Sequence, residues 1–144
     1  IDETLYDGQN KRFIPSAIEA LKKLQAKGVR VVLATGRPPL TAVVILREGV
    51  IPDAIVCASD FIADFVLRYL QETGRKTPDG FLLTGFDNNT EYANVAGRIT
   101  TVDVETSALG KRLARLLMFR AAYPDAPTVV GYVSTKILFR PPLG

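Results

Sequence analysis

Apolar side chains recur along this chain at two different spacings. Over residues 15–27 they return every three or four positions and Gly28 follows, which predicts an amphipathic helix that ends at this glycine. Residues 29–34 are then almost wholly apolar and rich in β-branched types, as is typical of a parallel strand covered on both faces. The strand ends at Thr35 in a polar Thr-Gly-Arg turn. Because ligands gather at the carboxyl ends of strands in open α/β sheets, this turn is a first candidate site.

The two spacings alternate through the rest of the chain. Helices are predicted over residues 39–47, 60–73 and about 106–118, and strands over 54–58, 81–86, 100–104 and 128–140. In the last helix we expect Thr106 or Ser107 to cap the first turn, and four leucines to face inward: Leu109, Leu113, Leu116 and Leu117. This alternation predicts a single α/β domain over residues 1–144, built on a three-layer, doubly wound parallel sheet of the flavodoxin-like, Rossmann-like type with strand order 2-1-3-4-5.

Composition and charge narrow the classes of partner. With 144 residues, of which 47% are hydrophobic and 23% charged, the chain can form one globular core. The net charge is +3 and the basic residues are spread along the predicted helices, so we expect no nucleic-acid partner. No apolar run approaches the ~20 residues of a membrane span and no secretion signal is present, so we expect no membrane partner and a soluble, cytoplasmic protein.

The chain contains no histidine, which excludes Ser-His and Cys-His catalysis and argues against a zinc site. Its single cysteine, Cys57, lies in the apolar stretch AIVCAS, where a buried core thiol is the expected role. Any chemistry must therefore rest on carboxylates, hydroxyls, lysine or arginine.

A first resemblance is carried by the segments IDETL, residues 1–5, and ATGR, residues 34–37. With the helix and strand between them, they resemble the opening of the haloacid-dehalogenase-like hydrolases of the Cof type, over about residues 1–40. The resemblance implies that Asp2 is a vestigial general acid and base, that Thr35 is a vestigial phosphate contact, and that the nucleophilic aspartate directly precedes residue 1. With the strand order above, Asp60 would lie near Asp2 and the two could hold Mg²⁺. Thr35 and Gly36 could equally form a plain strand-to-helix turn.

A second resemblance is carried by PDAIVCASD at residues 52–60, TGFD at residues 84–87 and TTV at residues 100–102. Over about residues 50–140 these segments resemble the carboxyl-terminal lobe of lactose-repressor-family regulators and related periplasmic sugar-binding proteins. The resemblance implies that Ser59 and Asp87 are vestigial contacts to a sugar-like ligand. Alternatively, Asp60 caps the following helix, and Asn88 and Asn89 serve a turn.

The two resemblances meet within residues 38–49, which suggests an engineered chimera: a phosphatase-like fragment over residues 1 to about 45, followed by a binding-protein-like fragment. We therefore expect a designed, de novo scaffold with no native catalytic activity, no obligatory small molecule and no cofactor. The alternatives are a residual Mg²⁺-dependent phosphatase and a weak sugar-binding lobe. A join between two parents is also expected to leave an apolar patch around residues 43–46, which would favour a homodimer.

Overall fold

The computed structural model describes residues 5–7, 12–39 and 43–143, and its centre is a parallel sheet of three strands. The strands are β3 (Val32–Thr35), β4 (Ala54–Cys57) and β5 (Leu82–Thr84), in the order β3-β4-β5. Leu33, Ile55 and Leu83 stand side by side across the sheet. The expected α/β architecture with a parallel sheet is therefore confirmed.

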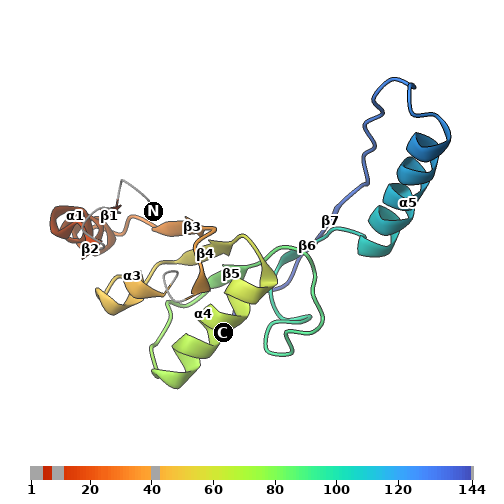
Figure 1. The fold of residues 1–144 in the computed structure, drawn as a ribbon. Coiled ribbons are helices and arrows are strands. Elements are labelled where there is room, and N and C mark those ends of the chain that lie inside the picture. Colours follow the sequence, from red (N-terminus) through yellow and green to blue (C-terminus); the bar gives the residue numbers. More distant parts are fainter. Residues whose placement is uncertain (1–4, 8–11, 40–42, 144) are drawn as a thin grey trace.

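Near the beginning of the chain lie a short antiparallel ribbon and the first helix: β1 (Tyr6–Asp7), β2 (Arg12–Phe13) and α1 (Pro15–Ala26). Two helices follow β3 and β4, namely α3 (Val44–Arg47) and α4 (Asp60–Glu72). The chain then forms β6 (Thr101–Asp103), α5 (Thr106–Ala122) and β7 (Lys136–Leu138), with β6 and β7 paired antiparallel. Helices α3 and α4 lie beside the central sheet, α1 with β1 and β2 lies beyond β3, and α5 projects on the far side (Figure 1).

The predicted strand order 2-1-3-4-5 is not confirmed. That order requires another strand between β3 and β4, yet these two pair directly along their whole length, from Val32 with Ala54 to Thr35 with Cys57. The backbone N–H of Asp53 also donates to the carbonyl of Val31 at 2.8 Å, so the pairing continues beyond the strand. Since β4 occupies this edge of β3, no other strand can bond there.

The apolar core lies on the face of the sheet that α4 covers. Its members include Leu33, Ile45, Leu46, Ile55, Val66, Leu70, Phe81 and Leu83, together with Phe13 of β2 and Ile18 of α1. Because Val43, Ile45 and Leu46 are buried in this core, the expected apolar patch at residues 43–46 is wrong, and a homodimer cannot be argued from it. Cys57 is buried here too, as its apolar surroundings predicted.

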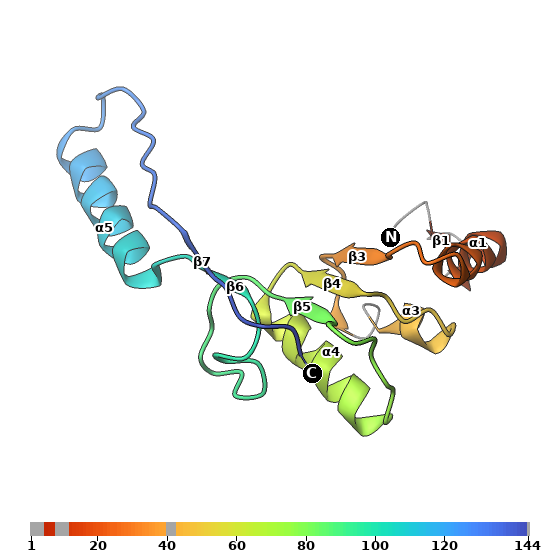
Figure 2. The ribbon, with the colours of Figure 1, turned by 180° about the vertical axis from the view of Figure 1, so that it is seen from behind.

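The opposite face of the sheet is open, in contrast to the prediction of strands covered on both faces. Val32 is 59% exposed and Val56 is 42% exposed, and Leu82 is exposed as well. Figure 2 shows the strands from behind, where α1 lies beyond the end of β3 instead of across the sheet. Since side chains alternate across a strand, only every second residue of β3 reaches the core.

Helix α5 projects away from the sheet on the β6–β7 ribbon (Figures 1 and 2). None of its residues is buried, so the prediction that its leucines face inward is wrong. The predicted cap by Thr106 or Ser107 is wrong as well, because the cap position is Glu105, in a left-handed conformation with φ 49° and no side-chain hydrogen bond. Within the described ranges, no helix is long and apolar enough to cross a membrane.

Candidate ligand-binding site

The carboxyl ends of β4 and β5 and the first residue of β6 meet around one buried carboxylate, that of Asp60. Asp60 is the first residue of α4 and is only 3% exposed. One carboxylate oxygen accepts a hydrogen bond of 2.7 Å from the hydroxyl of Thr101, and the other accepts one of 2.9 Å from the backbone N–H of Asn89. The backbone N–H of Asp60 donates to the carbonyl of Phe86 at 2.9 Å. These bonds hold three strand ends in one arrangement.

Ser59 precedes Asp60 and caps helix α4. Its backbone is extended, with φ −156° and ψ 160°, and its hydroxyl accepts the N–H of Ile62 at 3.3 Å. Such a cap satisfies one of the free N–H groups of the first helical turn. The cap is therefore Ser59, whereas the alternative weighed from the sequence gave this role to Asp60.

Asp87 lies beside this buried carboxylate, in a tight turn after β5. Asp87 and Asn88 both have positive φ angles, 94° and 51°, which these residue types tolerate better than most. The Asp87 carboxylate accepts the backbone N–H of Asn89 at 3.1 Å, and its own N–H donates to the carbonyl of Val102. The alternative of a turn is therefore confirmed for these two asparagines, and the same turn presents Asp87 at the strand ends.

The ionisation of Asp87 and Cys57 is perturbed at this edge. Burial first, and then the neighbouring carboxylate of Asp60, raises the pKa of Asp87 above its ordinary value of 3.8. Burial, with a further effect of Asp60, raises the pKa of Cys57 to about 12, so this thiol stays protonated and is not a nucleophile at neutral pH.

A raised pKa at Asp87 predicts a pH-dependent effect of Asp87→Asn on stability. The stability that Asp87 contributes is fully present below pH 3.8 and is lost as the pH rises through its folded-state pKa. Because asparagine does not ionise, the free energy of unfolding of the variant relative to the wild type should be higher at pH 7 than at pH 3. Urea unfolding at both pH values measures this difference; a relative gain that is larger at pH 3 would contradict it.

Thr35 ends β3, next to this edge, since it pairs with Cys57. Its hydroxyl accepts the backbone N–H of Arg37 at 3.1 Å, and its carbonyl accepts the N–H of Ala58. The hydroxyl thus serves the local turn, which was the plain alternative to a phosphate contact. Asp2, the other half of the phosphatase-like site, lies outside the described residues.

The donor set does not fit Mg²⁺ among the described residues. Both Asp60 oxygens already accept hydrogen bonds, and the described part of the chain has no group of three aspartate, glutamate, cysteine or histidine residues arranged so that it could hold a metal ion. Mg²⁺ is usually bound through carboxylates that leave several waters on the ion. The arrangement around Asp60 therefore does not support the chemistry of a Mg²⁺-dependent phosphatase.

Exposed aromatic rings accompany the polar groups, and these were not singled out in the sequence. Phe86, directly before Asp87, is 43% exposed. Phe61, in the first turn of α4, packs against Tyr92 with ring centroids 5.7 Å apart. Aromatic faces combined with carboxylates and hydroxyls suit a ring that carries hydroxyl groups, because its apolar face can stack while its hydroxyls donate. In the sequence, the Gly-Phe-Asp segment at residues 85–87 was the feature that could have pointed to Phe86.

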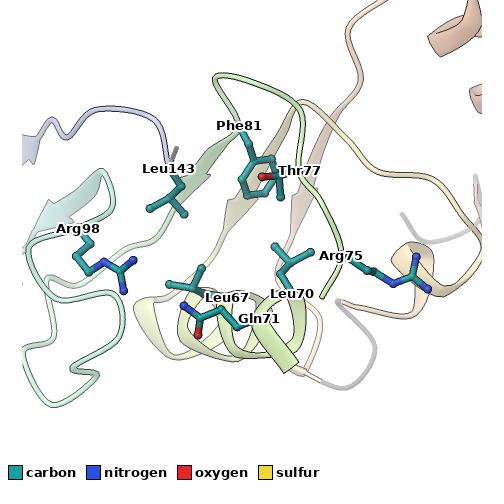
Figure 3. A pocket seen from close by; sticks show the side chains of 8 residues that line it. All are labelled: Leu67, Leu70, Gln71, Arg75, Thr77, Phe81, Arg98 and Leu143. Atoms are coloured by element: carbon teal, nitrogen blue, oxygen red, sulfur yellow. The ribbon is translucent and has the colours of Figure 1, made fainter. Parts of the chain in front are cut away.

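A separate pocket lies at the opposite, amino-terminal end of β5 (Figure 3). It has a volume of about 210 Å³, and its floor consists of apolar side chains from α4 and the start of β5, with two arginines among its lining residues: Leu67, Leu70, Gln71, Arg75, Thr77, Phe81, Arg98 and Leu143. Phe81 precedes β5 and Asp87 follows it, so the pocket and the edge around Asp60 lie at opposite ends of this strand. The two sites share no residue.

Comparison with known proteins gives a family match over nearly the whole chain. The family described as "Periplasmic binding protein-like domain" matches residues 14–140. The repressor PurR of Mannheimia succiniciproducens is 35% identical over 89 residues, and the regulator CelR of Thermobifida fusca is 30% identical over 88 residues. These segments cover 62% and 61% of this chain but only 27% and 26% of the relatives, so the chain matches about a quarter of their length.

Solved structures show the same fold. A complex of the transcriptional regulator CelR with cellobiose superposes with a TM-score of 0.62 at 21% identity, covering 83% of this chain and 49% of that chain. A LacI-type regulator from Bifidobacterium animalis subsp. lactis gives a TM-score of 0.64 at 20% identity, covering 85% of this chain and 62% of that chain.

These matches correct three expectations. The family match runs through residues 38–49 without a break, so the predicted join, the chimera and the haloacid-dehalogenase-like fragment are wrong. The relatives are natural regulators, which also overturns the engineered, de novo scaffold. They are named HTH-type transcriptional regulators, so the exclusion of nucleic acid is wrong, while the expectation of no enzymatic activity is confirmed.

Proposed function

Since the chain belongs to the family of periplasmic-binding-protein-like domains, we propose that it is the effector-binding part of a transcriptional regulator. Its ligand is a sugar-like molecule, and the protein that carries this chain acts on DNA. The names of the relatives support the regulatory role, and the solved complex of the regulator CelR with cellobiose supports the ligand class.

One observation carries the proposed site: the buried carboxylate of Asp60, which directly follows Ser59, shares the N–H of Asn89 with the carboxylate of Asp87. Asp60 is bonded to Thr101 of β6 and to the N–H of Asn89, which also bonds the Asp87 carboxylate. The ligand hydroxyls donate to Asp87 and its ring stacks on Phe86, which is exposed next to this carboxylate. Ser59 adds a hydroxyl that is only half-buried.

Binding to the isolated chain is expected to be weak, because the strand ends form one side of a cleft and good sites enclose most of their ligand. A dissociation constant of about 1 mM corresponds to about 4 kcal/mol. A large excess of ligand is therefore needed, since about 100 times the dissociation constant raises the free energy of unfolding by about 2.7 kcal/mol.

The test is thermal unfolding of the chain with a panel of cellobiose, pentoses, hexoses and nucleosides. At least one of these ligands is expected to raise the Tm of the wild type. Asp87→Asn removes a charged acceptor while tolerating the positive φ, so it should lose most of this shift. Asp79→Asn is the matched control, because Asp79 lies before β5 at the other end of the sheet and should keep the shift.

Two results would contradict the proposal. The first is a panel in which no ligand moves the wild-type Tm at high concentration. The second is a shift that Asp87→Asn retains in full, which would place the ligand elsewhere on the chain.

A further inference from the structure

The pocket at the amino-terminal end of β5 has a fixed apolar floor. Three of its side chains, those of Leu67, Leu70 and Phe81, are at most 7% exposed, so the floor is largely withdrawn from water. The backbone N–H of Leu143 donates to the carbonyl of Phe81 at 3.0 Å, and this bond holds Leu143 as one wall of the pocket. Core packing and a backbone hydrogen bond therefore set the shape of the lining.

The charged part of this lining is entirely positive. Arg75 and Arg98 are two of the eight lining residues, which include no aspartate and no glutamate. Among the residues that the structure describes, neither arginine forms an ion pair. The partner that complements this charge is therefore an anionic group.

Arg98 is the arginine placed to contact such a group. One N–H of its guanidinium donates to the carbonyl of Asn94 at 2.9 Å, which restricts the side chain. The guanidinium has five N–H donors in a planar fork that matches the two oxygens of a carboxylate. Figure 3 shows the side chain of Arg98 extending toward α4, whereas that of Arg75 points away from the pocket. Arg75 therefore adds positive charge at longer range.

The volume of the pocket limits the size of the ligand. It is about 210 Å³. In another protein, a cavity of about 150 Å³ lined by leucine, isoleucine and phenylalanine is large enough to bind benzene. The pocket beside β5 therefore has room for one six-membered ring with a small anionic substituent.

We propose that this pocket binds a small aromatic carboxylate, whose ring lies against Leu67, Leu70 and Phe81 and whose carboxylate accepts hydrogen bonds from Arg98. An apolar floor that holds the body of a ligand, with few polar groups to orient it, is the usual construction of a small-molecule site. This ligand differs from the proposed sugar-like effector in charge and in hydrophobicity. Since the two sites lie at opposite ends of β5, each can be tested without the other.

The experiment is a titration of the whole chain with benzoate at pH 7, followed by methyl NMR. The ring current of a bound aromatic ring shifts the signals of methyl groups close to it. The methyl signals of Leu67, Leu70 and Leu143 should move together and saturate, with a dissociation constant of about 1 mM. Leu109 and Leu113 are the internal control, because they are exposed on α5 and should not respond.

Two ligands and three variants separate the roles of ring and charge. Benzamide keeps the ring without the charge and acetate keeps the charge without the ring, so each should bind at least about tenfold more weakly than benzoate. Arg98→Gln should cause a similar loss, and Arg98→Lys a smaller one, because lysine keeps the charge but not the fork. Lys76→Gln is the matched control: it removes an exposed positive charge that does not line the pocket, and binding should be unchanged.

Three results would each overturn the proposal. They are leucine methyl signals that stay in place up to about 20 mM benzoate, benzamide binding as tightly as benzoate, and full affinity in Arg98→Gln. The comparison of benzoate with benzamide uses the wild type, so it decides the question even if Arg98→Gln does not fold. The effect of Asp87→Asn on stabilisation by sugars tests the other site separately.

Discussion

Replacing Gly85 with alanine is expected to lower the free energy of unfolding by about 3 kcal/mol, because a methyl group here has no space. Gly85 follows β5, and a Cβ atom would overlap the Asp60 carboxylate and approach the Cα atom of Asp60 to 3.1 Å. The carboxylate cannot yield without breaking its bonds to Thr101 and Asn89. The helix α4 would therefore have to move as a whole, since Asp60 is its first residue.

Thermal unfolding checks this prediction, with a decrease in Tm of about 10 °C as the expected result. Gly36→Ala is the matched control: Gly36 follows β3, the other outer strand of the central sheet, and its added Cβ meets only the Ala58 side chain at 3.6 Å, an ordinary contact. That variant should change stability by less than about 1 kcal/mol. Equal effects of the two substitutions would show that Asp60 is not packed as tightly as the structure describes.

Asp60→Ala is expected to destabilise the protein by about 3 kcal/mol. It removes the acceptor of the Thr101 hydroxyl and one of the two acceptors of the Asn89 N–H, in a position that is almost fully buried. Loss of these bonds should also free the turn at Asp87, so ligand-induced stabilisation should decrease together with the free energy of unfolding. Urea unfolding with and without ligand measures both quantities.

Asp60→Asn is the conservative comparison for this position. Its amide oxygen can accept the Asn89 N–H while its NH₂ group donates to the Thr101 hydroxyl, so the cost should stay below about 1 kcal/mol. It also removes the negative charge that contributes to the raised pKa of Asp87, so the pKa of Asp87, followed by NMR, should decrease. An Asp60→Asn variant as unstable as Asp60→Ala would contradict the role of Asp60 as a hydrogen-bonded hub.

Residue order predicted that Ser59 and Asp87 lie at strand ends, whereas their assignment as ligand contacts came from the family resemblance. Ser59 and Asp87 each follow a β-branched or leucine-rich strand, and the ends of neighbouring parallel strands meet at one edge. The pattern did not show that Asp60 is buried under this edge, because an aspartate at the start of a helix looks the same whether it faces water or a partner. Thr101 lies 41 positions away, and only the folded chain brings its hydroxyl to this carboxylate.

The resemblance at the start of the chain was misleading for a related reason. A polar turn after an apolar strand is common to α/β folds of many functions, and here the Thr35 hydroxyl serves the turn itself. A short motif at a strand end is therefore better evidence for the fold than for a catalytic site. The match over residues 14–140 corrected the inference because it uses the order of many elements at once.

The sequence by itself determined the type of most elements, since the spacing of apolar residues follows the geometry of the backbone. A spacing of 3.6 residues predicted the helices α1 and α4, and the continuous apolar stretches between them predicted strands of a parallel sheet. Only the tertiary structure decided which apolar surfaces are covered. Leu33 and Val32 are neighbours of similar hydrophobicity, yet one is in the core and the other faces water. Helix α5 has the leucine pattern of a buried helix and packs against no core, because the β6–β7 ribbon carries it away from the sheet. Local spacing sets the conformation of a segment, whereas burial depends on contacts between distant segments.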